Sequence, residues 1–146
     1  MNDIERLIAL EDIRSVRAKY CRYIDTHEWH RLKDIMTADA VLDLSHTGTV
    51  LGVEIRPIKG VHAIAESLAQ NCDKLRKLLH IVTTPIIEFE NDNVATGIWR
   101  QETFIKETRP DLPGTGIAYC SAHDTYQRTD DGWRIASVRI TMDIVL

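Results

Sequence analysis

The sequence predicts an α+β fold in which N-terminal helices pack against a curved, cone-shaped antiparallel sheet. Apolar residues recur at helical spacing in the first part of the chain, whereas long segments rich in β-branched residues follow position 77. Polar turn sequences at 90–93 and 130–132 separate these segments as hairpin turns do. Because helices come first and strands last, the pattern is typical of the α+β class. The length of 146 residues fits one domain, 1–146.

Three helices are expected. The first, 3–23, is amphipathic, with Asn2 or Asp3 as its cap. A short helix at 30–37 follows, and Gly60 opens the third. The buried positions of this third helix are expected at Ile64, Leu68 and Cys72.

The strands alternate with turns. A turn at 46–48 is expected between two short strands, and a Pro- and Gly-containing loop at 108–116 between two long ones. The predicted strands are 40–44, 50–55, 79–90, 94–106, 117–128 and 133–145.

Composition narrows the range of functions. The net charge is −4 and acids and bases are interspersed, which argues against a nucleic-acid partner. The sequence has no long apolar segment and no signal-peptide pattern at its start, so we expect a cytoplasmic protein without a membrane partner. The three cysteines are widely spaced, which favours reduced thiols over disulfides or a metal site. Phosphate-loop, GxSxG and HExxH motifs are absent, so we expect no metal and no cofactor.

Tyr20, Asp25 and His80 are the candidate catalytic residues. A histidine whose ring N–H is held by a carboxylate has a fixed tautomer and a more basic second nitrogen, which can remove a proton from a substrate. A tyrosine hydroxyl is a suitable hydrogen-bond donor to a leaving group or an oxyanion. Tyr20 and Asp25 face the same cavity only if the first helix ends between them. The alternative is that Asp25 caps the second helix and His80 is a structural or surface histidine.

Several motifs in order along the chain resemble a SnoaL-like protein of the nuclear-transport-factor-2-like superfamily. They cover nearly the whole chain, and their order and spacing carry the resemblance more than any one of them. They are Tyr20-x4-Asp25, Thr37-Ala38-Asp39-Ala40-Val41, the helix introduced by Gly60, His80 at the head of a strand, Gly97-Ile98-Trp99 and Asp131-Gly132-Trp133-Arg134-Ile135.

This resemblance implies the cone-shaped α+β fold, also called cystatin-like, and a catalytic pair. The superfamily includes scytalone dehydratase, bile acid 7α-dehydratase, lindane dehydrochlorinase, ketosteroid isomerase and polyketide cyclases. In its dehydratases and dehydrochlorinases an aspartate near the end of the first helix pairs with a histidine of the sheet, which corresponds to Asp25 and His80. A tyrosine five residues before the aspartate recurs among the dehydratases and corresponds to Tyr20.

Five further residues are candidates for substrate binding. Trp99 and Trp29 offer surfaces for a flat substrate, although core packing is the alternative for both. Strand alternation puts Tyr119 and His123 on one face, which is either a pocket wall or the solvated face. An inward Arg139 would bind a carboxylate or phenolate of the substrate. For both Arg139 and Glu102, a shift of one residue in strand register would turn the side chain to the outer face.

The resemblance and the residues together predict a cofactor-independent lyase, with dehydration first, or an isomerase or cyclase. The substrate is expected to be small, hydrophobic and cyclic or aromatic. One alternative is a non-catalytic small subunit of a ring-hydroxylating dioxygenase, which would co-purify with a larger iron–sulfur chain. Another is a ligand-binding module without turnover. We also expect a homo-oligomer, a dimer or a trimer, formed through the outer face of the sheet.

Overall fold

The computed structural model describes residues 1–72, 76–108, 110 and 114–146. The helices are α1 (Asp3–Asp25), the 3-10 helix η1 (Trp29–Asp34), α2 (Ser45–Leu51) and α3 (Val61–Asn71). The strands are β1 (Met36–Asp43), β2 (Ile58–Lys59), β3 (Arg76–Val82), β4 (Ile86–Asn91), β5 (Val94–Glu107), β6 (Gly114–Thr129) and β7 (Gly132–Val145).

Helix α1 begins with a capping box. The Asn2 side chain accepts the backbone N–H of Glu5 at 2.9 Å, and the Glu5 carboxylate accepts that of Asn2 at 2.8 Å. The helix ends at Asp25, where the backbone N–H of Thr26 donates to the carbonyl of Arg22. The predicted first helix is therefore confirmed, with its C-terminal end two residues further along.

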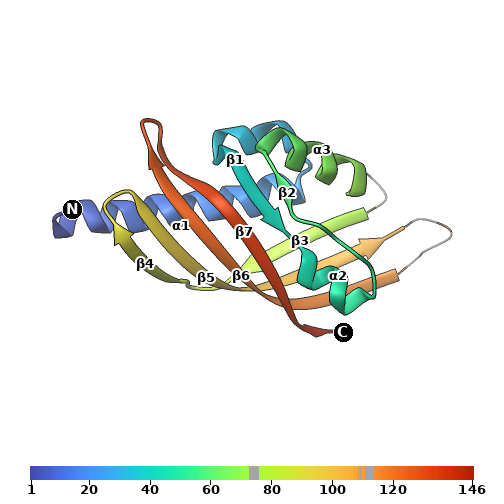
Figure 1. Ribbon diagram of the computed structural model, residues 1–146. Helices are drawn as coiled ribbons and strands as arrows, with labels where there is room; N and C mark the ends of the chain where they lie inside the picture. The colour runs from blue at the N-terminus through green and yellow to red at the C-terminus, as the bar shows by residue number, and fades with distance from the viewer. Residues whose placement is uncertain (73–75, 109, 111–113) are drawn as a thin grey trace.

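The strands form one mixed sheet in the order β2-β1-β7-β6-β5-β3, with β4 also paired to β5. Strand β1 runs parallel to β7, whereas the other pairings are antiparallel. Figure 1 shows α1 lying along one face of this sheet, where it contacts β3 and β7. The predicted α+β class, with N-terminal helices against a curved antiparallel sheet, is confirmed. The parallel β1–β7 pair is the one departure from the expected strand directions.

Residues 45–51 form α2, so the predicted turn at 46–48 and strand at 50–55 are wrong. The β-branched residues Thr47, Thr49 and Val50 favour a strand locally, but the segment packs as a helix against β7. Gly52 ends this helix in the left-handed region, with φ of 72°. At Gly48 a Cβ atom would lie 2.6 Å from the carbonyl oxygen of Val53, so the following chain folds tightly back onto the helix.

The predicted strand 79–90 is two strands that follow one another along β5. Strand β3 pairs with residues 101–107 of β5, and β4 pairs with residues 94–98. The interruption at 83–85 contains Pro85, which has no N–H for a sheet ladder. His80 consequently lies inside β3 and not at the head of a strand.

Two other boundaries differ from the prediction. The second helix is the 3-10 segment η1, and Met36 and Thr37 already belong to β1. The loop expected at 108–116 is shorter, because β6 starts at Gly114, and positions 109 and 111–113 lie outside the described residues.

The core lies between α1, α3 and the inner face of the sheet. Cys21, Cys72 and Cys120 are buried. Within the described ranges, no helix is both long and apolar enough to cross a membrane. The largest fully buried apolar side chains are Tyr126, Ile13, Leu32, Met36, Leu42, Ile64, Ile135 and Val138.

Candidate active site

Asp25 and His80 are in direct contact, although 55 residues separate them in sequence. The ring Nδ1 of His80 lies 2.6 Å from Asp25 Oδ1, and the backbone N–H of His80 donates to Asp25 Oδ2 at 2.9 Å. The side chain of His80 is only 9% exposed and that of Asp25 only 12%. Because a carboxylate can only accept, the proton between them belongs to Nδ1, which leaves the lone pair on Nε2. One carboxylate thus fixes both the backbone and the ring of His80.

His80 lies on the wall of a cavity of about 370 Å³ between the helices and the inner face of the sheet. This volume is within the range of about 300–1,000 Å³ typical of small-molecule sites. In the part of the chain that the structure describes, Nε2 of His80 has no hydrogen-bond partner. The apolar residues of the lining are Ile24, Leu42, Leu44, Leu51, Ile55, Ile58, Leu68, Leu78, Ile105, Ala118, Ile140 and Met142.

Tyr20 lines the same cavity from α1 and is 5% exposed. Helix α1 continues past Tyr20 to Asp25, so the two residues reach the cavity differently: Tyr20 directly and Asp25 through His80. Burial raises the pKa of Tyr20 above its usual value, although the Arg17 guanidinium lies over the ring at 4.9 Å. The hydroxyl therefore stays protonated near neutral pH and is available as a donor.

A buried polar network lies beneath the cavity floor. Arg17 donates two bonds to the Asp124 carboxylate, at 3.1 and 3.2 Å, and both side chains are fully buried. Arg17 also donates to the Gln101 side chain, at 2.5 Å. The Tyr126 hydroxyl donates to Asp124 at 2.6 Å and accepts the indole N–H of Trp99 at 2.9 Å. This network joins α1 to β5 and β6 under the site.

Tyr119, His123 and Arg139 do not line this cavity, so the structure does not bring these predicted substrate-binding residues to His80. Every second residue of β6 from Ala118 to Tyr126 is buried, including Cys120 and Asp124. Tyr119 and His123 therefore lie on the outer face of the sheet. Arg139 is paired with His123 in the ladder and is exposed. The alternation of β6 was predicted correctly, but the sequence left open which face was inward.

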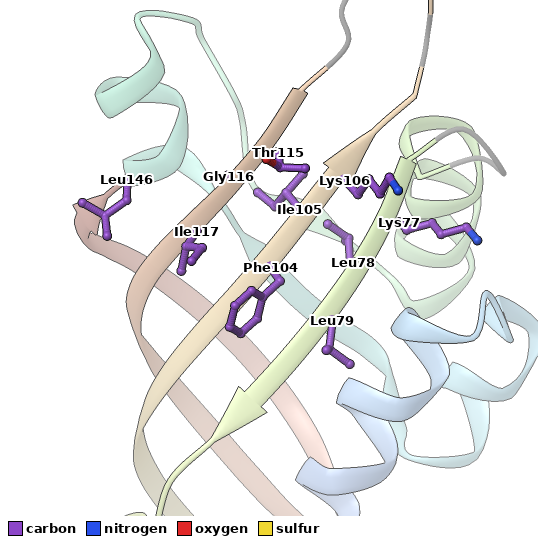
Figure 2. A pocket seen from close by; sticks show the side chains of 10 residues that line it. All are labelled: Lys77, Leu78, Leu79, Phe104, Ile105, Lys106, Thr115, Gly116, Ile117 and Leu146. Carbon is purple, nitrogen blue, oxygen red and sulfur yellow. The ribbon is translucent and has the colours of Figure 1, made fainter.

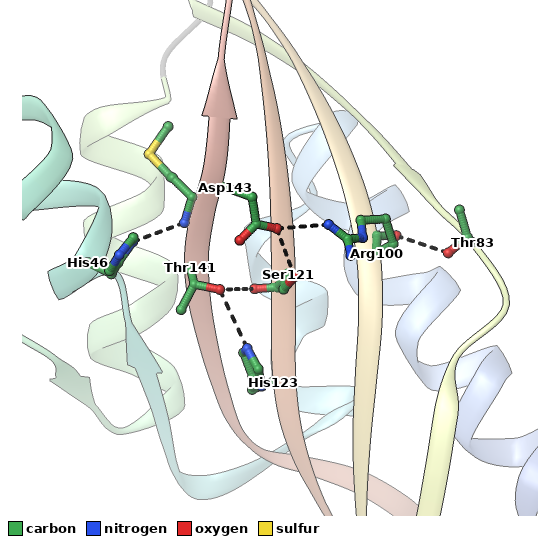
Figure 3. A network of polar contacts seen from close by, with 8 residues as sticks. His46, Thr83, Arg100, Ser121, His123, Thr141 and Asp143 are labelled. Atoms are coloured by element: carbon green, nitrogen blue, oxygen red, sulfur yellow. Dashed lines mark hydrogen bonds and ion pairs between the residues drawn. The ribbon is translucent and has the colours of Figure 1, made fainter.

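The outer face carries its own polar contacts, drawn in Figure 3. The Asp143 carboxylate accepts from Arg100 at 3.1 Å and from the Ser121 hydroxyl at 2.9 Å. Thr141 lies beside His123, with 3.5 Å between Oγ1 and Nε2. The His46 ring accepts the backbone N–H of Met142 at 3.0 Å. These groups stabilise the solvent-facing surface of the sheet and do not reach His80.

Neither tryptophan candidate lines the cavity. Trp99 is 3% exposed and packs in the core, where its indole N–H is already bound to Tyr126. Trp29 stacks on His27, with ring centroids 5.1 Å apart. Glu102 lies opposite Tyr119 in the ladder and therefore shares the outer face. The core alternative weighed for Trp99 describes its position.

A second hollow lies on the outer face, across β3, β5 and β6 (Figure 2). It has a volume of about 630 Å³. Leu79, Phe104 and Ile117 follow one another across these strands, because Phe104 is the ladder partner of both others. Lys77 and Lys106, which are ladder partners of each other, lie on one side of this row. We call these five residues, with Leu146, the outer groove.

The residues predicted from the sequence did not include Arg17, Gln101 and Thr103. Gln101 and Thr103 line the cavity and Arg17 holds Gln101 from below. A signal for the pair on β5 was present, since an outward Glu102 requires inward neighbours. A buried arginine in an amphipathic helix leaves no comparable signal.

Residues 5–139 match the SnoaL-like domain. The chain belongs to the SnoaL-like domain family. The predicted resemblance is thereby confirmed. No curated protein sequence matches the chain.

Solved structures place this SnoaL-like domain in the nuclear-transport-factor-2-like fold. A candidate scytalone dehydratase from Novosphingobium aromaticivorans DSM 12444 is 16% identical, with a TM-score of 0.84 over 100% of this chain and 91% of that one. A type 2 hexachlorocyclohexane dehydrochlorinase is 20% identical, with a TM-score of 0.82 over 99% and 92%. A nuclear-transport-factor-2-like superfamily protein from Salmonella enterica serovar Typhimurium LT2 is 16% identical, with a TM-score of 0.80 over 95% and 94%. At these identities the likeness establishes the shared fold.

Proposed function

We propose that this protein is a cofactor-independent lyase that removes water from a small, hydrophobic, cyclic substrate. The observation that carries the proposal is the Asp25–His80 pair on the wall of an apolar cavity, with Nε2 of His80 left for a ligand. Membership in the SnoaL-like family and the dehydratase and dehydrochlorinase among its structural neighbours support a lyase. Isomerisation or ring closure through an enolate would use the same groups.

The steps follow from the positions of the three side chains. Nε2 of His80 removes a proton from a carbon beside an electron-withdrawing group, and Asp25 stabilises the imidazolium that forms. The electron pair released from the C–H bond becomes a double bond as the hydroxyl on the next carbon departs. Tyr20 donates a hydrogen bond to that hydroxyl, and the proton that completes the water returns from His80. The protein ends each cycle in its starting protonation state.

A direct test uses 3-hydroxy-1-tetralone, a bicyclic β-hydroxy ketone whose loss of water yields 1-naphthol. We expect the purified protein to accelerate the appearance of 1-naphthol fluorescence, with or without a metal chelator. If neither this ketone nor its monocyclic analogues react faster than in buffer, the elimination proposal is wrong. Binding without reaction would then favour the ligand-binding module.

We further propose that the protein forms a homo-oligomer through the outer groove. Leu79 is 53% exposed within an apolar row, and such exposed patches commonly mark association surfaces. Leu79→Lys adds a third positive charge beside the Lys77–Lys106 pair and is expected to shift the protein to the monomer in size-exclusion chromatography with light scattering. Val53→Lys, at a position 55% exposed outside the groove, is the matched control and should leave the mass unchanged. A monomeric wild-type protein would contradict the proposal.

A further inference from the structure

The inner face of β5 places a second polar group beside His80. Thr103 is the direct ladder partner of His80 in the β3–β5 pairing, and both side chains line the cavity. Directly opposed residues of an antiparallel pair have Cβ atoms roughly 4.5–5.5 Å apart. A ligand atom against Nε2 of His80 therefore has the Thr103 hydroxyl as an immediate neighbour.

The buried network fixes the orientation of the Gln101 side chain. Arginine has only donors, so the Gln101 atom bonded to Arg17 must be the carbonyl oxygen Oε1. The amide nitrogen Nε2 is then turned to Thr103 and donates to its Oγ1 at 3.0 Å. This orientation cannot reverse, because a flipped amide would turn the NH2 group of Gln101 toward the N–H donors of Arg17.

The hydrogen bonds around Asp124, on the other side of Arg17, also have fixed donors and acceptors. Asp124 accepts from both Arg17 and Tyr126, and Tyr126 in turn accepts from Trp99. Burial raises the pKa of Tyr126 well above its usual value, as does the neighbouring Asp124, so this hydroxyl remains a donor. The Arg17 guanidinium, fully buried and paired with Asp124, thus holds the amide that donates to Thr103.

The O–H group of Thr103 remains as a donor without an acceptor in the buried network. Its oxygen already accepts from Gln101, so its own O–H proton must point elsewhere. Among the residues that the structure describes, the Thr103 hydroxyl has no acceptor, and the side chain is 8% exposed on the cavity wall. A buried hydroxyl without an acceptor costs free energy that a ligand oxygen would recover.

We propose that the Thr103 hydroxyl donates a hydrogen bond to a carbonyl oxygen of the substrate, with Gln101 and Arg17 as its positioning residues. This inference rests on the proposed function, since the carbonyl would lie beside the carbon from which His80 takes its proton. Charge that develops on the carbonyl oxygen meets a donor backed by the amide of Gln101 and the buried guanidinium. The substrate class is accordingly a cyclic ketone with a β-hydroxyl group. A halogenated hydrocarbon without oxygen would leave Thr103 unpaired.

The test uses 1-tetralone, which carries the carbonyl but no leaving group and so reports binding alone. Infrared difference spectra with a 13C-labelled carbonyl give the stretching frequency of the bound ketone. We expect a lower frequency in the wild-type protein than in Thr103→Val, which is of similar shape but has no hydroxyl, with recovery in Thr103→Ser. Affinity should fall roughly threefold to tenfold in Thr103→Val, as expected for one neutral hydrogen bond. Gln101→Leu, which keeps the Thr103 hydroxyl but removes its support, should give an intermediate frequency.

The outcomes separate this inference from the proposed elimination. An identical carbonyl frequency in the wild-type protein and Thr103→Val would overturn the role of Thr103, even if 3-hydroxy-1-tetralone is dehydrated. A failure of 1-tetralone and 1-indanone to bind would overturn the ketone class. If the frequency depends on Thr103 but no hydroxy ketone is dehydrated, the binding role stands and the elimination fails.

Discussion

His80→Ala is expected to lower kcat/KM for 3-hydroxy-1-tetralone by about 10²–10⁴-fold, the usual contribution of a positioned general base. The ring is held at 2.6 Å by Asp25 and the residue lines the cavity, so alanine removes the proposed base and leaves the apolar walls in place. Asp25→Asn should also lower turnover strongly. In asparagine one of the two oxygen positions becomes an NH2 donor, which would oppose either the ring Nδ1–H or the backbone N–H of His80, and the compensating charge is gone.

The matched control for this experiment is His123→Ala. His123 is also a strand histidine, but it lies on the outer face, with its Nε2 3.5 Å from Thr141 Oγ1. Activity in this variant should stay within about twofold of the wild-type protein. Near-normal activity in His80→Ala, with unchanged thermal unfolding, would exclude His80 as the base. If His80→Ala does not fold, His80→Gln provides the same comparison with the side-chain volume retained.

Asp124→Asn is expected to lower the free energy of unfolding by about 3–5 kcal/mol, because it leaves the fully buried Arg17 charge without its carboxylate. Urea denaturation followed by circular dichroism measures this loss. Arg17→Met combined with Asp124→Asn should recover part of it, since the uncompensated charge is then gone.

Asp143→Asn is the control for burial. Asp143 and Arg100 are separated by 3.1 Å, the same distance as in the buried pair, but their side chains are 34% and 62% exposed. Exposed pairs contribute about 0–1 kcal/mol, so this variant should remain near wild-type stability. Equal losses in Asp124→Asn and Asp143→Asn would show that the buried pair does not organise the core.

Residues whose position depends on local pattern were predictable. The amphipathic period of α1 placed Tyr20 on the buried stripe and Asp25 near the helix end. The β-branched segment around His80 indicated a strand, and the contact between Asp25 and His80 followed from the family resemblance. The pattern did not show which of the two alternating faces of β6 points into the core. Both faces of this strand carry polar residues, so either could be the inner one. The partner of the buried Asp124, Arg17, lies 107 residues away in the sequence.

Other features depended on tertiary contacts. The segment 45–51 has poor intrinsic helix preference, and its helix is set by packing on β7 and by Gly52 at its end. Thr103 looked like any strand threonine, because its role arises from Gln101 and from the ladder partner His80. Pro85 was visible in the sequence and was a sufficient reason to divide the strand predicted at 79–90.

The wall of the cavity formed by residues 44–58 has a consequence for how such a protein diversifies. This wall contributes Leu44, Leu51, Ile55 and Ile58, whereas Asp25, His80 and Thr103 belong to α1, β3 and β5. Substitutions in 44–58 can therefore reshape the space for a ligand without moving the groups that we propose handle its protons. Selection could exchange one ring system for another through this short segment while the proposed reaction is inherited unchanged.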